Sequence, residues 1–95
     1  MTRTYLACLW HHEHPDEPVE LYSELDSKRW ELRKVEVYRK GHGDVAGPGV
    51  QTGDTRLGEA PCPPLEEIAA TPELEPRVIT KEEFEAVWRR YATSQ

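Results

Sequence analysis

Residues 79–91 read ITKEEFEAVWRRY, and this stretch decides the fold because it specifies a helix with one apolar face. Thr80 is a favourable N-cap residue, and Glu83 follows at the spacing of a capping box. Apolar side chains then recur at the i, i+3, i+4, i+7 spacing of one helical face: Phe84, Val87, Trp88 and Tyr91. The pattern predicts a helix over residues 80–92 whose apolar face packs on another element.

That other element is predicted near the start of the chain, in residues 4–12. Apolar side chains occupy consecutive positions there, so that both faces of an extended segment are apolar: Tyr5, Leu6, Ala7, Cys8, Leu9 and Trp10. A strand that is buried on both faces is usually central in its sheet. We therefore expect the C-terminal helix to cover one face of this sheet.

Two further strands are predicted over residues 19–26 and 30–40. In the first, Val19, Leu21 and Leu25 form a core face, and the alternate positions form a solvent face: Glu20, Tyr22, Glu24 and Asp26. In the second, the earlier and later apolar residues would face opposite sides of a regular strand. One additional residue near Arg33-Lys34, a β-bulge, would place them on the same side.

The rest of the chain is rich in glycine and proline. All six glycines lie in residues 41–58, which we read as a flexible loop over about residues 41–54 and a short strand around residues 55–57. A short helix is expected at residues 65–70, and Pro72 and Pro76 predict an extended link. The predicted fold is a single α+β domain over residues 1–95: an antiparallel β-meander of three to four strands, with a short helix and a C-terminal α-helix packed on one face.

The charge of the chain excludes a general nucleic-acid binder. Asp and Glu number 18 against 12 Lys and Arg, and the net charge is −6, whereas phosphate binding needs exposed cations. The charge is also uneven: residues 28–40 carry +4, and residues 59–86 carry −6. An acidic C-terminal half suits a partner with a basic surface.

The expected compartment is the reducing cytoplasm. Cys8 and Cys62 are too few for a disulfide framework. The apolar run of residues 6–10 is too short for a signal sequence or a membrane span, so we expect no membrane association.

The most suggestive polar run is His11–Pro18, where an apolar strand pattern ends. Strand alternation places His12 and His14 on one face and His11 on the other. Two imidazoles at this spacing can chelate a metal, but Pro15 ends the strand and no metal-binding motif supports the pair, so we expect no metal and no cofactor. Asp16 or Glu17 would be able to orient a histidine for proton transfer, yet no nucleophile–base pair can be named.

A third interpretation is protein recognition. Aromatic, histidine and arginine side chains anchor protein interfaces, although we expect Trp10 and Trp30 to lie in the core and Tyr22 to be exposed. The leading prediction is a non-catalytic protein-binding domain, an immunity-type inhibitor or an accessory protein, and either a monomer or a weak homodimer. The alternative is a small enzyme or a metal- or ligand-binding protein that uses the His11–Glu17 corner. The candidate binding residues are His11, His12, His14, Asp16, Glu17, Tyr22 and Arg33.

Two stretches also carry a family resemblance, LWHHEHPDEPVELYSEL at residues 9–25 and RWELRKVEVY at residues 29–38. Together with residues 55–59, 65–68 and 82–88, they resemble a family of short bacterial proteins, common in actinobacteria, known only as a domain of unknown function. The resemblance covers nearly the whole chain, and it implies no activity, cofactor or catalytic residue.

Overall fold

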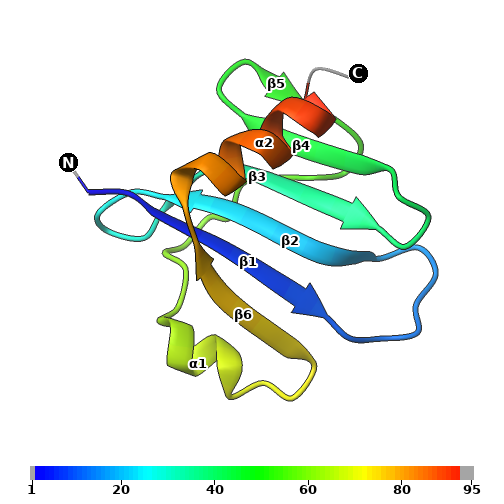
Figure 1. Ribbon diagram of the computed structural model, residues 1–95, viewed down its shortest axis with the longest axis horizontal. Helices are drawn as coiled ribbons and strands as arrows, with labels where there is room; N and C mark the ends of the chain where they lie inside the picture. The colour runs from blue at the N-terminus through cyan, green and yellow to red at the C-terminus, as the bar shows by residue number, and fades with distance from the viewer. Residues whose placement is uncertain (1, 93–95) are drawn as a thin grey trace.

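Six antiparallel strands form one sheet within residues 2–92, the part of the chain that the computed structural model describes. Their spatial order is β5-β4-β3-β2-β1-β6. The first five strands follow one another as a meander, and the sixth returns to the other side of β1 (Figure 1). Their bounds are β1 Thr4–Trp10, β2 Pro18–Leu25, β3 Glu31–Tyr38, β4 Gly43–Gly47, β5 Val50–Gln51 and β6 Leu74–Ile79.

The α+β class and the antiparallel sheet are confirmed, but the prediction of three to four strands is wrong. The glycine-rich stretch contains β4 and β5, and residues 55–57 are not a strand. The predicted link through Pro72 and Pro76 contains β6, which pairs with β1. Pro76 is tolerated because β6 is an edge strand, where a missing backbone N–H interrupts no ladder on the outer side.

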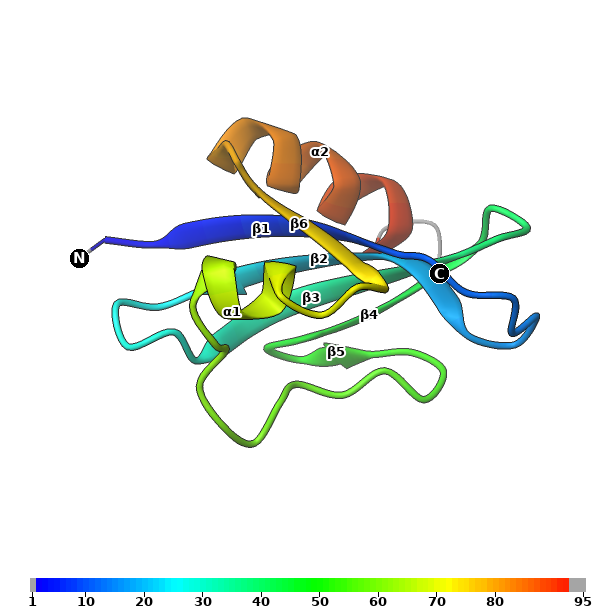
Figure 2. The same cartoon turned by 90° about the horizontal axis from the view of Figure 1, so that it is seen from below.

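The C-terminal helix α2 (Lys81–Ala92) packs on one face of the sheet, as predicted (Figure 2). Its capping box is present: Glu83 donates its backbone N–H to Thr80 Oγ1 at 3.0 Å, and Thr80 donates its own to Glu83 Oε1 at 3.1 Å. Phe84 is fully buried in one cluster, and the rest of the apolar stripe packs on a second cluster in the middle of the sheet. The buried members of these clusters are Tyr5, Ala7, Ile79 and Phe84 in the first, and Val35, Val37 and Val45 in the second.

The two glycines of β4 explain why this strand escaped prediction. A Cβ atom at Gly43 would lie 2.6 Å from the ring of Tyr91, and one at Gly47 would lie 2.9 Å from the ring of Trp88. Both aromatic rings belong to α2, so glycine is present here because the helix lies close to the strand. Glycine is otherwise depleted in strands, and the residue pattern alone indicated a loop.

Part of the opposite face of the sheet is covered by residues 52–64, here called the strap (Figure 2). Thr55 is buried and donates from Oγ1 to Glu36 Oε1 of β3 at 2.6 Å. Arg29, in the β2–β3 turn, donates to the carbonyl oxygens of Cys62 at 2.9 Å and Pro63 at 2.7 Å. The strap leads into the short helix α1 (Leu65–Ala69), which packs near β6.

A bulge does interrupt the β2–β3 pairing. Glu24 pairs with Arg33 and Leu25 pairs with Glu31, so Leu32 is the additional residue. The bulge lies immediately before Arg33, close to the predicted position. Trp30 precedes the strand and is 40% exposed, so the expectation that it lies in the core is wrong.

Candidate functional site

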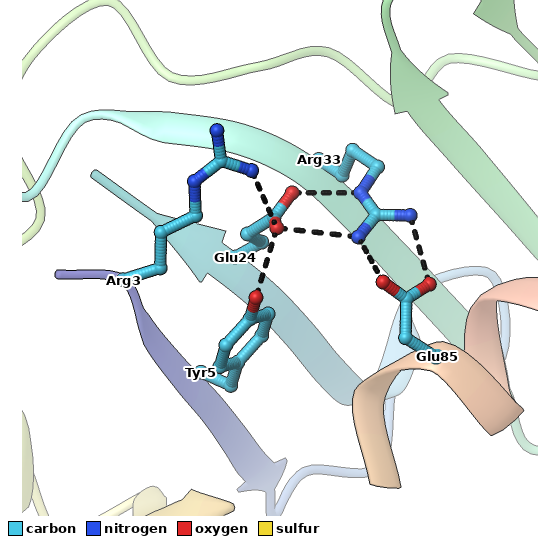
Figure 3. A network of polar contacts seen from close by, with 5 residues as sticks. All are labelled: Arg3, Tyr5, Glu24, Arg33 and Glu85. Carbon is cyan, nitrogen blue, oxygen red and sulfur yellow. Dashed lines mark hydrogen bonds and ion pairs between the residues drawn. The ribbon is translucent and has the colours of Figure 1, made fainter. Parts of the chain in front are cut away.

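Arg33 lies under α2, at the centre of a network of charged groups (Figure 3). Its guanidinium donates to both carboxylate oxygens of Glu24, at 2.7 and 3.2 Å, and to both of Glu85, at 3.1 and 2.8 Å. It also lies 5.0 Å from the ring centroids of Phe84 and Trp88. Its donors and its planar face are therefore occupied within the fold, and Arg33 joins the sheet to the helix.

The prediction that the alternate positions of residues 19–26 face solvent is wrong for Glu24. Its side chain is only 3% exposed, on the sheet face that α2 covers, and it also accepts from Tyr5 Oη at 3.2 Å and Arg3 Nη1 at 3.1 Å. Such burial is tolerated because two arginines neutralise the carboxylate.

The protonation of this network is fixed around neutral pH. Burial by itself raises the pKa of Glu24, but the hydrogen bonds and positive charge of Arg33 outweigh it and lower the pKa below its ordinary value. Burial and the nearby Glu24 raise the pKa of Tyr5. A general acid or base needs a pKa near the working pH, so neither group is suited to proton transfer.

Tyr22 is half-buried, which contradicts its predicted exposure. It packs against both core clusters, and its hydroxyl donates to Glu20 Oε1 at 2.5 Å. Burial, followed by the hydrogen bond to Glu20, raises its pKa. A small hollow of about 120 Å³ next to it is lined by Ala7, Cys8, Leu9, Glu20, Tyr22, Glu75, Pro76 and Arg77.

The histidines lie beyond the end of β1, and the most constrained of them is His12. Its Nδ1 accepts the backbone N–H of His14 at 2.9 Å, so its proton is on Nε2, which donates to the carbonyl oxygen of Pro18 at 2.8 Å. Both ring nitrogens therefore stabilise the turn. A metal would have to displace one of these hydrogen bonds.

The other polar side chains of residues 11–18 do not converge on one point. His11 interacts with Glu75 of β6 at 3.0 Å, whereas the ring of His14 lies 5.3 Å from that of His12. Asp16 and Glu17 are exposed. No group of three or more His, Cys, Asp or Glu side chains suited to a metal occurs in residues 2–92.

The two cysteines also lack the setting of a nucleophile. Burial raises the pKa of both Cys8 and Cys62, which favours the thiol over the reactive thiolate. Within the described part of the chain, neither thiol hydrogen-bonds to a histidine. Among residues 2–92, neither cysteine is therefore paired with a histidine base.

Trp10 is the residue around which the surface at this end of the sheet is organised. It is half-buried at the end of β1, with its ring centroid 4.3 Å from that of His12 and its Nε1 donating to Glu73 at 3.4 Å. Its side chain lines three separate hollows of about 330, 440 and 320 Å³. The sequence pattern placed Trp10 in the core because it could not show that β1 ends there.

These three hollows all border Trp10, and we call their combined lining the Trp10 corner. It joins the end of β1 and the following turn to the start of β2, Arg39 and the residues that lead into β6. Five carboxylates and one arginine line it. Its residues are Leu9, Trp10, His11, His12, Glu13, His14, Pro15, Asp16, Glu17, Val19, Glu20, Leu21, Arg39, Thr71, Glu73 and Leu74.

The fold and this surface define a small α+β domain with an open, acidic corner centred on a tryptophan. The chain belongs to the family described as Domain of unknown function (DUF6881), which matches residues 4–93. The resemblance to an uncharacterised domain family is thereby confirmed. No curated protein and no solved structure matches the chain. Among residues 2–92, no helix is long and apolar enough to cross a membrane.

Proposed function

We propose that this protein is a small non-catalytic protein-binding domain, an immunity-type inhibitor or an accessory protein, which contacts its partner through the Trp10 corner. The observation that carries the proposal is that one tryptophan side chain lines three hollows at one end of the sheet. Tryptophan is among the residues most enriched at the energetic centres of protein interfaces. Open hollows around such a residue suit the side chains of a protein partner.

The chemistry of the corner supports binding over catalysis. Catalysis requires polar groups that converge on a reacting atom and are free to act on it. Here the ring nitrogens of His12 are engaged with the backbone, His11 points to Glu75, and Arg33 lies under α2. The enzyme alternative at His11–Glu17 therefore gains no support from the arrangement of these side chains.

The sheet edges also favour an interface made by side chains. His11 donates its backbone N–H to the carbonyl oxygen of Glu73, which sets the hydrogen-bond pattern between β1 and β6. In this pattern every second residue of β6 directs its backbone N–H and C=O groups away from β1, and Pro76 and Val78 are among these residues. Pro76 has no N–H to offer a further strand, and the other edge, β5, has only two residues. Both features discourage strand pairing between copies, so we infer a monomer.

The test is a comparison of two tryptophan variants in the cells that make the protein. A chain carrying an affinity tag is purified with its partner, the partner is identified by mass spectrometry, and the complex is rebuilt from purified components. Trp10→Ala should weaken the rebuilt complex by tenfold or more, which corresponds to about 1.4 kcal/mol. Trp30→Ala removes an exposed indole at the opposite end of β2 and should leave the affinity unchanged.

Two results would contradict the proposal. The first is a complex that tolerates Trp10→Ala and is lost with Trp30→Ala. The second is that the purified chain forms no complex with any co-purifying protein. Circular dichroism and urea titration of both variants would establish that each is folded before affinities are compared.

A further inference from the structure

We propose that the partner presents a basic polypeptide segment to the Trp10 corner, with an apolar side chain flanked by arginine or lysine. This inference rests on the protein-binding function proposed above and names the chemistry of the partner. The evidence for it is a pair of hollows that are both lined by Trp10. One takes the apolar side chain, and the other, edged by carboxylates, takes a cationic side chain.

The apolar hollow lies on the sheet face opposite α2. Trp10 pairs directly with Leu74 across β1 and β6, and Leu21 pairs with Cys8, two residues before Trp10, so these three side chains share a face. Together with Thr71 and Glu73 they line a hollow of about 320 Å³. An aliphatic side chain from a partner would remove apolar surface from water on all three.

The second hollow lies on the turn that follows β1. It has a volume of about 440 Å³ and is lined by Trp10, His14, Pro15, Asp16 and Glu17. In the described part of the chain, the carboxylates of Asp16 and Glu17 are exposed and form no ion pair with a lysine or arginine. They are therefore available to a cation, which an arginine could supply while lying against the indole ring.

The charge around the corner favours a basic occupant. Its lining has five carboxylates against one arginine, and that arginine, Arg39, already donates to the carbonyl oxygen of His12 at 2.7 Å. The whole chain carries a net charge of −6. Such a surface repels phosphates and carboxylates and speeds association with a basic protein.

The two hollows share the side chain of Trp10, so one occupant is expected to fill both. An extended peptide places side chains i and i+2 on the same side, about 7 Å apart, which lets two of them enter neighbouring hollows. A lone inorganic cation would fill neither the apolar hollow nor the space beside the indole. A basic peptide satisfies both requirements at once.

The experiment uses short probe peptides and the indole N–H signals of the protein. The first probe is a blocked peptide, Gly-Ser-Arg-Arg-Leu-Arg-Arg-Ser-Gly. The second replaces its leucine with serine, and the third replaces its arginines with glutamates. In a ¹⁵N-edited NMR titration, the first probe should shift the Trp10 indole signal saturably, and those of Trp30 and Trp88 should stay in place. The second should bind several-fold more weakly, and the third should not bind.

Two charge variants provide a matched comparison. Glu17→Gln with Glu73→Gln removes two carboxylates at the corner, and Glu66→Gln with Glu67→Gln removes two on the exposed surface of α1. Both change the net charge equally, yet only the first should weaken the arginine probe, by fivefold or more. Equal weakening by both pairs, or equal affinity for the leucine and serine probes, would overturn the proposal because binding would then depend on net charge alone.

The results also distinguish the proposal of a basic partner from the broader proposal of a protein-binding function. If the probes do not reach Trp10 while Trp10→Ala still disrupts the cellular complex, the protein-binding function stands and the basic partner is excluded. If the probes bind at Trp10 but the cellular complex tolerates Trp10→Ala, the corner recognises basic segments and the function proposed for it in the cell is wrong.

Discussion

Glu24 pairs with Arg33 in the β2–β3 register and accepts hydrogen bonds at 2.7 and 3.2 Å from its guanidinium. The same guanidinium donates to Glu85 of α2 and lies over the ring of Phe84. A cross-strand pair thereby also attaches the helix to the sheet. The contact explains how a strand position that looks like solvent surface in the sequence is buried.

The first prediction concerns the loss of this cation. Arg33→Met should lower the free energy of unfolding by about 3–5 kcal/mol, because Glu24 then keeps a buried charge without its main partner. Urea denaturation followed by circular dichroism measures the change. Lys40→Met removes an exposed cation and should stay within about 0.5 kcal/mol of the unmodified protein. If the two variants are equally stable, the network does not stabilise the fold.

The second prediction concerns acid. The hydrogen bonds from Arg33 are the main cause of the lowered pKa of Glu85, and they also lower that of Glu24 against the effect of burial. A carboxyl group with a lower pKa in the folded state stabilises the protein above its unfolded pKa, about 4.3, and this stabilisation is lost as the pH falls through the folded pKa. The free energy of unfolding should therefore fall as the pH drops below about 5.

Glu85→Gln tests the cause of this dependence. The variant lacks one of the two carboxyl groups of this network whose pKa is lowered, so its free energy of unfolding should change less steeply with pH in the acid range. Urea titrations at a series of pH values measure that slope. Glu66→Gln removes an exposed carboxyl of α1 and should keep the original slope. A steeper slope for Glu85→Gln would contradict the assignment.

The elements that sequence predicted well are those whose signal is local. The capping box from Thr80 to Glu83 and the apolar spacing from Phe84 specify α2 without knowledge of the rest of the chain. The missed strands depend on distant contacts. Gly43 is explained by the ring of Tyr91, 48 positions later in the chain, and β6 tolerates Pro76 only because it lies at the edge.

The candidate site likewise has features that the sequence predicted and features that it did not. Alternation along the strand predicted that His11 would point away from His12, and His11 does interact with Glu75 of β6. Alternation cannot show that the ring of His12 is occupied by the backbone of its own turn, nor where β1 ends. The position of Trp10 between several hollows depends on the start of β6, which the sequence did not predict.

The third prediction concerns the distance between β4 and α2. Gly43→Ala should cost about 1–3 kcal/mol, because its Cβ would overlap the ring of Tyr91 and push the helix outward. Thermal and urea unfolding measure the loss. The double variant Gly43→Ala with Tyr91→Leu should be less destabilised than the sum of the two single changes, since the smaller side chain makes room. Strict additivity would show that the contact does not limit the approach of the helix.

The fourth prediction concerns Arg29, which has a left-handed backbone with φ of 68°. Arg29→Ala and Arg29→Gly both lose the side-chain hydrogen bonds to the strap, but only alanine keeps the strain, so the glycine variant should be more stable by about 1 kcal/mol. Urea denaturation of both variants measures the difference. An alanine variant as stable as the glycine variant would contradict the strain argument.

The last prediction separates the two histidines at the end of β1. His12→Ala should lower the free energy of unfolding by about 1–2 kcal/mol, because it removes the acceptor for the backbone N–H of His14 and the donor to Pro18. His14→Ala removes an exposed ring and should cost less than about 0.5 kcal/mol. Zinc added to the untagged protein should leave the melting temperature unchanged, because metal binding at His12 would break the hydrogen bonds that form the turn. A rise in melting temperature with zinc that disappears in both variants would instead identify the pair as metal ligands.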